Sequence, residues 1–357
     1  MATRAATMED ARLPLRPTRL RPRLLLVALG AVAAAALAGV LVGPVGLSPA
    51  GVLRELLDRL PLVAVDSGLG ETERAILWQI RIPRVVVGGM VGAALAMAGA
   101  AYQGVFRNPL ADPYLLGAAA GAGLGATLAV AYLPSTEGPV GPLPAAAFIG
   151  ALVGVGAAYG LGRSVGRSRT SGTLILAGVA VASFLTAVQT YFQQREDDTL
   201  RQVFAWILGT LGTVTWREVA LVAPYLLVGG VVLVLHRRLL DVLSLGDEEA
   251  ESLGVRAGRV RLVIVIAASL ATAAAVAVSG LIGFVGIIVP HAVRLAFGGS
   301  YRLVLPLSIA FGAAFLVLTD LAARTVLAPA EIPIGVVTAF FGAPFFLVVL
   351  RRSRGMA

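Results

Sequence analysis

The chain has 357 residues, of which 58% are hydrophobic and only 14% are charged. With a mean hydropathy of +0.87, this composition excludes an ordinary soluble domain and indicates a polytopic membrane protein. All 29 basic residues are arginine, and a phosphate-binding loop of the Walker A type needs a lysine. Any ATP chemistry must therefore belong to a separate chain. The sequence has no cysteine, which excludes disulfides, thiolate metal sites and cysteine nucleophiles.

Ten apolar stretches recur along the chain, each close to the approximately 20 helical residues that cross a hydrocarbon core of about 30 Å. They lie at residues 24–43, 85–105, 114–133, 143–161, 173–194, 219–236, 260–280, 281–297, 303–323 and 334–350. The eighth stretch is short and contains Pro290 and Arg294, so we expect a broken or partly buried helix there. The first stretch has no small-residue cleavage site close behind it, and we expect a retained span.

These stretches predict an all-α polytopic membrane protein with about ten transmembrane helices. A single transmembrane domain would cover residues 24–350, between a tail of residues 1–23 and a tail of residues 351–357. Residues 197–209 are typical of a short amphipathic helix at a membrane surface, with Asp197 or Asp198 as its N-cap.

Arginine is distributed unevenly between the two sides that this topology defines. With the N-terminus inside, the inner segments carry 20 arginines and the outer segments carry nine. Positive loops stay in the cytoplasm, so we expect both termini there, together with residues 237–258.

Glycine recurs at four-residue spacing inside two of the predicted spans. The positions are Gly117, Gly121 and Gly125, then Gly150 and Gly154, and then Gly156 and Gly160. Small residues at this spacing allow helix backbones to approach closely in lipid, so we expect all of them to pack helices together.

The predicted spans carry few groups that could drive transport. The first seven contain essentially no ionisable residue, which argues against an ion-coupled carrier. Asp320 lies four residues before Arg324, and the two are expected to pair on one helix face. His236 and His291 have no carboxylate at ligand spacing, so we expect no metal site, no catalytic cluster and no cofactor in this chain.

Seven segments in order resemble the permease subunits of type II ABC importers, the FecCD-type family of cobalamin, haem and ferric-siderophore transporters. They are WQIRIPR (78–84), RNPLADPYLLG (107–117), LILAGVA (174–180), LGDEEAESLGV (245–255), GFVGIIVPH (283–291), LPLSIAFGAAFLVLTDLAAR (305–324) and EIPIGVVTAFFGAPFF (331–346). The resemblance implies a homodimer in a bacterial inner or cytoplasmic membrane, with two ATPase subunits that carry ATP and Mg²⁺, an extracytoplasmic substrate-binding protein and no nucleic acid.

The resemblance also implies roles for particular residues. The binding protein would dock on Arg81, Arg84 and Arg324. The alternative is that these arginines only snorkel to the membrane interface. A cytoplasmic gate would comprise Asn108, Pro109, Leu110, Thr170 and Ser171. The alternative is that these residues form well-capped turns with no gating role. Hydrogen-bonding side chains of the fifth span would line the central cavity: Ser183, Thr186, Gln189, Thr190 and Gln193.

Residues 244–255 place four carboxylates beside two apolar spans. From the residues alone, Asp247 would cap a helix of about two turns, Glu248 and Glu249 would occupy its first turn, and Gly254 would end it. The resemblance makes this segment the coupling helix that contacts the ATPase, through Asp247, Glu248, Glu249, Glu251, Leu253 and Gly254. A solvated loop helix is the alternative.

Together, the residues and the resemblance predict that this chain is the membrane-spanning subunit of an ATP-driven importer of a metal chelate. A ferric siderophore is the preferred cargo, with haem or cobalamin as alternatives, and this preference comes from the resemblance. The chain itself would catalyse no bond chemistry. An ATP-independent carrier or channel is the competing function, and a membrane-embedded enzyme is disfavoured because no catalytic cluster is present.

Overall fold

The computed structural model describes residues 20–59, 61, 65–134, 141–164, 171–195 and 200–354. Residues 1–19 and 355–357 of the tails lie outside these ranges, as do Thr170, Asp197 and Asp198. The described residues form helices and connecting loops, without a strand.

Ten of the helices coincide with the ten predicted spans. They are α1 (Pro22–Leu41), α4 (Ile82–Phe106), α5 (Ala118–Tyr132), α6 (Pro142–Ser164), α7 (Ser171–Arg195), α9 (Trp216–Leu243), α11 (Ala257–Ser279), α12 (Val285–Phe297), α13 (Tyr301–Thr325) and α14 (Ile334–Arg354). Seven of the described helices are long and apolar enough to cross a membrane, whereas α5, α12 and the apolar part of α14 are shorter. The all-α polytopic fold is confirmed.

Shorter helices connect these spans. They are α2 (Pro49–Asp58), α3 (Glu71–Ala75), the π-helix η1 (Ile76–Arg81), α8 (Leu200–Ile207) and α10 (Asp247–Ser252). The predicted amphipathic helix is present as α8, in which Val203 and Trp206 are buried and Phe204 is exposed. Because η1 continues directly into α4, Arg81 and Arg84 stand on one continuous helix.

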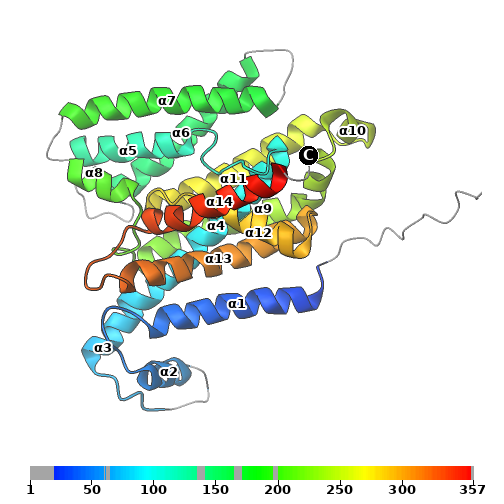
Figure 1. The fold of residues 1–357 in the computed structure, drawn as a ribbon. Coiled ribbons are helices and arrows are strands. Elements are labelled where there is room, and N and C mark those ends of the chain that lie inside the picture. The colour runs from blue at the N-terminus through cyan, green and yellow to red at the C-terminus, as the bar shows by residue number, and fades with distance from the viewer. Residues whose placement is uncertain are drawn as a thin grey trace, which may run out of the picture.

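Helix α4 is the centre of the bundle, with α11, α12 and α13 packed around it (Figure 1). About 83% of its most apolar window is buried, against 17% for the peripheral α9. The packing depends on glycine: a Cβ on Gly92 would lie 2.2 Å from the carbonyl oxygen of Gly312 in α13. A Cβ on Gly99 would lie 2.1 Å from that of Gly286 in α12. A larger residue at either position would force α4 away from the neighbouring helix.

The glycines predicted from spacing divide into two groups. A Cβ on Gly121 of α5 would lie 2.1 Å from the carbonyl oxygen of Gly150 in α6, so the predicted close packing of these helices is confirmed. Gly156 and Gly160 differ, because a Cβ on either would meet no atom within 4 Å. The packing role predicted for these two is wrong, since they lie on a side of α6 that faces open space.

The eighth predicted span is only 13 residues long as α12. Irregular backbone at residues 280–284 precedes it, with Phe284 in the left-handed region at φ 68°. Pro290 lies inside the helix and is buried, as are Val285, Gly286, Ile288 and Val289. The expected short, partly buried helix is therefore confirmed.

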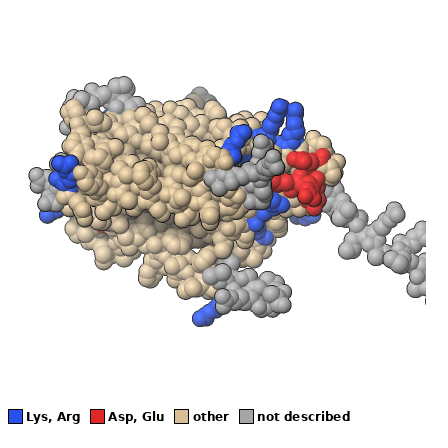
Figure 2. Space-filling model, turned by 90° about the horizontal axis from the view of Figure 1, so that it is seen from above, with Lys and Arg blue, Asp and Glu red and all other residues tan. Residues whose placement is uncertain are grey.

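The two ends of the bundle differ in their connections. Helices α2, α3 and α8 lie at one end, and α10 and the C-terminus lie at the other (Figure 1). Most charged side chains of the face drawn in Figure 2 gather at its two ends, while the band between them consists mainly of other residues. Such a band is what an apolar hydrocarbon core requires. Following the orientation that the arginine distribution predicts, we call the end with α2, α3 and α8 the outer end and the end with α10 the inner end.

Candidate functional site

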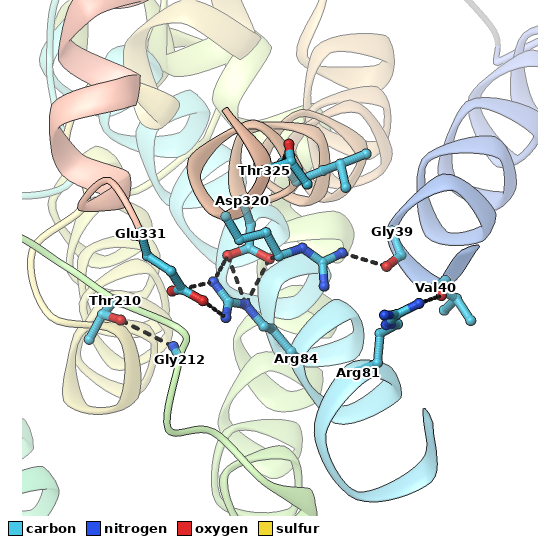
Figure 3. Close-up of polar contacts among 11 residues, drawn as sticks. Gly39, Val40, Arg81, Arg84, Thr210, Gly212, Asp320, Thr325 and Glu331 are labelled. Carbon is cyan, nitrogen blue, oxygen red and sulfur yellow. Dashed lines mark hydrogen bonds and ion pairs between the residues drawn. The ribbon is translucent and has the colours of Figure 1, made fainter. Parts of the chain in front are cut away.

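A buried cluster of charges lies at the outer end (Figure 3). Arg84 of α4 donates through Nη2 to Asp320 Oδ1 of α13 at 2.8 Å and through Nε to Oδ2 at 3.0 Å. The same guanidinium donates from Nη1 and Nη2 to both carboxylate oxygens of Glu331, at 2.8 and 2.9 Å. Arg84 thus joins α4, α13 and the loop before α14, and two-point contacts of this kind fix orientation.

Two further arginines extend the outer cluster towards α1. Arg324 lies one turn after Asp320, with 3.6 Å between Nε and Oδ2, so the predicted pair on one helix face is confirmed. Its Nη2 also donates to the carbonyl oxygen of Gly39. Arg81 donates to the carbonyl oxygens of Val40 at 3.0 Å and Val45 at 2.6 Å, where α1 ends. The bonds to Gly39 and Val40 satisfy carbonyls that the end of α1 leaves without partners.

These three arginines are buried, whereas docking of a binding protein requires exposed side chains. Arg81, Arg84 and Arg324 are only 3%, 5% and 3% exposed. Snorkelling is also excluded for them, because their guanidinium groups bind internal acceptors. Their docking role stays a prediction, and in this conformation it competes with internal partners.

Glu331 is the member of the cluster that we did not anticipate. The sequence shows it only as a carboxylate before the last span, and its partner is 247 residues away. Its side chain is 37% exposed, so it lies at the solvent edge of the cluster. The hydrogen bonds and charge of Arg84 hold the pKa of Glu331 below its usual range, and Arg324 adds to this effect.

At the inner end, α10 forms a short acidic helix. It runs from Asp247 to Ser252, and Gly254 stops it as predicted, with a φ of +77° that is readily available to glycine. Ala250 is buried beneath the helix, and Leu253 is 62% exposed at its tip.

Asp247 does not have the role we predicted from sequence. The N-cap is Gly246, and the Asp247 carboxylate accepts bonds from Arg261 Nη2 at 2.7 and 2.9 Å. Arg107 also approaches it, at 3.4 Å. Asp247 therefore ties α10 to α11 and α4, which leaves three carboxylates exposed to a partner: Glu248, Glu249 and Glu251.

Comparison with known proteins shows the family of the chain. The FecCD transport family matches residues 30–352. The chain belongs to the FecCD transport family. It is 43% identical over 284 residues to the cobalamin import system permease BtuC of Halobacterium salinarum, covering 80% of this chain and 75% of the relative. It is 35% identical over 310 residues to the Fe(3+)-citrate import system permease YfmE of Bacillus subtilis, covering 87% and 89%.

A solved structure agrees with the family. It is described as an inward-facing metal-chelate type ABC transporter, and it superimposes with a TM-score of 0.80 at 27% identity. The match covers 93% of this chain and all of the other chain. This FecCD chain is therefore a permease subunit of an ABC importer, a class in which the ATPase is a separate subunit.

The residues predicted for the gate of this FecCD permease lie at the inner end of α4. Arg107 ends that helix in the left-handed region, and the Asn108 side chain accepts a bond from the backbone N–H of Leu110 at 2.9 Å. Asn108 thus caps the turn after α4. Pro109 is exposed, Ser171 begins α7, and Thr170 lies outside the described residues. Gating by this loop stays a prediction.

The residues predicted to line the cavity do not share one face of α7. Ser183, Thr186 and Thr190 are exposed, whereas Gln189 is 8% exposed and its carboxamide packs against Gly123 of α5. Gln193 is half-buried. Gln189 supports helix packing instead of lining an open surface. No group of three metal-binding side chains occurs within the described part of the chain.

Proposed function

We propose that two copies of this chain form the membrane pathway of an ATP-driven importer of a metal chelate. Two ATPase subunits would bind at the inner end and a substrate-binding protein at the outer end. The observation that carries this proposal is α10, with its exposed carboxylates on the inner end of a FecCD permease. Both termini would lie in the cytoplasm of a bacterial cell, because arginine is concentrated on that side.

Helix α10 would transmit the motion of the ATPase. Its exposed surface combines Glu248, Glu249 and Glu251 with Leu253, a mixture that suits a cleft on a soluble partner. Asp247 supports this role from inside, because its bonds to Arg261 connect α10 to α11. A pull on α10 would therefore reach a transmembrane helix through a charged contact as well as through the chain.

The outer arginines would dock the binding protein by exchanging partners. Glu331 is the exposed edge of the cluster, so carboxylates of an incoming protein would compete with it for Arg84. Since Arg84 also holds Asp320 of α13, such an exchange would disturb the contact between α4 and α13. Docking would then loosen the outer end of the pathway.

The pathway would lie between the two copies. Ser183, Thr186 and Thr190 provide polar groups on the exposed face of α7 that would line it. The turn at Asn108, Pro109 and Leu110, together with Thr170 and Ser171, would close the inner end.

A ferric siderophore is the cargo that we propose, and cobalamin is the second candidate. The iron-citrate permease among the relatives supports the first, and the 43% identity to a cobalamin permease favours the second. The test is a binding assay of the partner substrate-binding protein with a ferric siderophore, haem and cobalamin in parallel. Submicromolar binding of a siderophore alone supports the first cargo, and binding of either other ligand alone replaces it.

Transport by the reconstituted complex tests the function itself. The purified chain and its ATPase are placed in liposomes, and uptake of the bound chelate is measured with and without ATP. We expect no uptake when either ATP or the ATPase is omitted. Uptake that persists without both would establish the ATP-independent carrier instead.

A further inference from the structure

Two joined cavities follow the line where α6 meets α11. The first, of about 560 Å³, lies at the inner end and is lined by Arg163, Arg256 and Arg259, among others. The second, of about 620 Å³, continues between the same helices towards the middle of the bundle. Tyr159 and Arg163 line both, so the two cavities form one groove.

The second cavity is apolar and has the depth of one membrane leaflet. It extends from Arg163 to Leu152 on α6, which at about 1.5 Å per residue is about 16 Å. Half of a hydrocarbon core of about 30 Å is nearly the same depth. The flanking side chains of Val153 and Ile266 are 58% and 57% exposed, so the groove opens sideways towards lipid.

Gly156 and Gly160 line this groove, and they explain why it is empty. A Cβ on either would meet no atom within 4 Å, so no neighbouring helix occupies the space beside them. Deep in the cavity, the hydroxyl of Ser269 already donates to the carbonyl oxygen of Val265 and contacts the Tyr102 hydroxyl at 2.6 Å. Beside the two glycines the groove therefore offers space and mainly apolar surface.

The inner mouth of the groove carries an excess of positive charge. Arg163, Arg256 and Arg259 are exposed and form no ion pair with any residue that the structure describes. Arg261, which also lines the mouth, is bound to Asp247. Glu251 is the only carboxylate among the described lining residues. An anion with one or two charges would balance this group.

We propose that an anionic phospholipid of the inner leaflet binds this groove, with its phosphate at the arginines and one acyl chain beside Gly156 and Gly160. The proposal rests on the orientation proposed above. Basic pockets between transmembrane helices on the cytoplasmic side suit anionic headgroups. The continuity between the charged mouth and the apolar groove favours a lipid over a free phosphate, because a free phosphate has no acyl chain to fill the groove.

Native mass spectrometry of the purified full-length chain tests this proposal. The chain is titrated with dioleoyl phosphatidylglycerol, dioleoyl phosphatidylcholine or glycerol phosphate. We expect phosphatidylglycerol to bind more tightly than the other two. Arg163→Gln with Arg259→Gln should weaken its binding roughly 10- to 30-fold. Each arginine near an anionic membrane surface raises the affinity roughly three- to fivefold, and the double variant loses two such contributions. Arg237→Gln with Arg238→Gln removes the same charge from the inner end of α9 and should leave binding unchanged.

A second pair of variants tests the acyl-chain part of the groove. Gly156→Leu fills the groove without meeting another helix and should weaken binding of phosphatidylglycerol several-fold. Gly30→Leu places the same side chain on α1, where a Cβ also meets no atom within 4 Å, and should have no effect. Glycerol phosphate that binds as well as the lipid would overturn the proposal.

Two other results would also overturn it. One is equal binding of the two phospholipids. The other is loss of ATPase co-purification in Arg163→Gln with Arg259→Gln while lipid binding is unchanged, because the mouth would then belong to the ATPase interface. The titration uses neither the ATPase nor cargo, so its failure is distinguishable from a failure of the transport proposal.

Discussion

Arg84 and Asp320 lie 236 residues apart in the sequence and form a two-point ion pair between α4 and α13. Both side chains are at least 94% buried, so each charge depends on the other for its solvation. Removing one partner of a buried ion pair leaves the other charge buried without compensation. This destabilises a protein far more than replacing both partners with apolar residues. The pair therefore makes the outer end of the bundle sensitive to single substitutions.

Asp320→Asn should destabilise the protein, because Arg84 and Arg324 would both lose a buried anion. We expect a loss of about 3 kcal/mol, since Glu331 still binds Arg84. Thermal unfolding in detergent measures the effect. Asp66→Asn is the matched control, because the Asp66 side chain is 90% exposed, and it should leave the midpoint unchanged. Equal midpoints for the two variants would contradict a structural role for the pair.

Glu331→Gln separates docking from internal packing. If Arg84 docks the binding protein, the loss of the Glu331 charge frees it, and affinity for the binding protein should rise several-fold. Arg81→Glu with Arg84→Glu should lower that affinity at least 10-fold. Arg54→Glu changes an exposed arginine of the same end and should have a much smaller effect. Unchanged affinity in both test variants would limit the arginines to an internal role.

The Glu331 carboxylate should also make stability depend on acid pH. Its pKa is lowered in the folded protein, chiefly by Arg84, so its contribution is fully present above the usual value of 4.5. That contribution is lost as the pH falls below 4.5 and through the folded-state pKa. The difference in unfolding midpoint between the native chain and Glu331→Gln should therefore be largest at neutral pH and shrink below about pH 4. A difference that grows on acidification would contradict this assignment.

The sequence predicted the spans well because their signals are local. Apolar length and the glycine at position 254 each depend on a few adjacent residues. The outer cluster depends on pairings across 236 and 247 residues, which no local pattern reveals. Four-residue glycine spacing is ambiguous for a related reason. The spacing puts Gly156 and Gly160 on one face of α6, and only the tertiary structure shows that this face lacks a neighbour.

Substitutions in α10 should separate assembly from stability. Glu248→Arg with Glu249→Arg changes exposed side chains, so we expect normal thermal stability but loss of ATPase co-purification and of ATPase stimulation. Asp247→Asn should instead lower stability, because the partly buried Asp247 neutralises Arg261. Asp66→Arg with Glu71→Arg makes the same charge change at the outer end and should preserve ATPase binding. Undiminished co-purification in the α10 double variant would remove its coupling role.

The two groups of glycines should respond oppositely to alanine. Gly121→Ala would place a Cβ 2.1 Å from the carbonyl oxygen of Gly150, and backbone cannot yield as a flexible side chain can. Helices α5 and α6 would have to separate, and we expect a loss of about 1–3 kcal/mol. Gly156→Ala places the same methyl group in open space on α6. There it should raise stability by about 0.5–1 kcal/mol, because alanine loses less conformational freedom in a helix than glycine does. Thermal unfolding of the two variants side by side measures the contrast, and a similar loss in both would show that α6 packs against a neighbour at Gly156 as well.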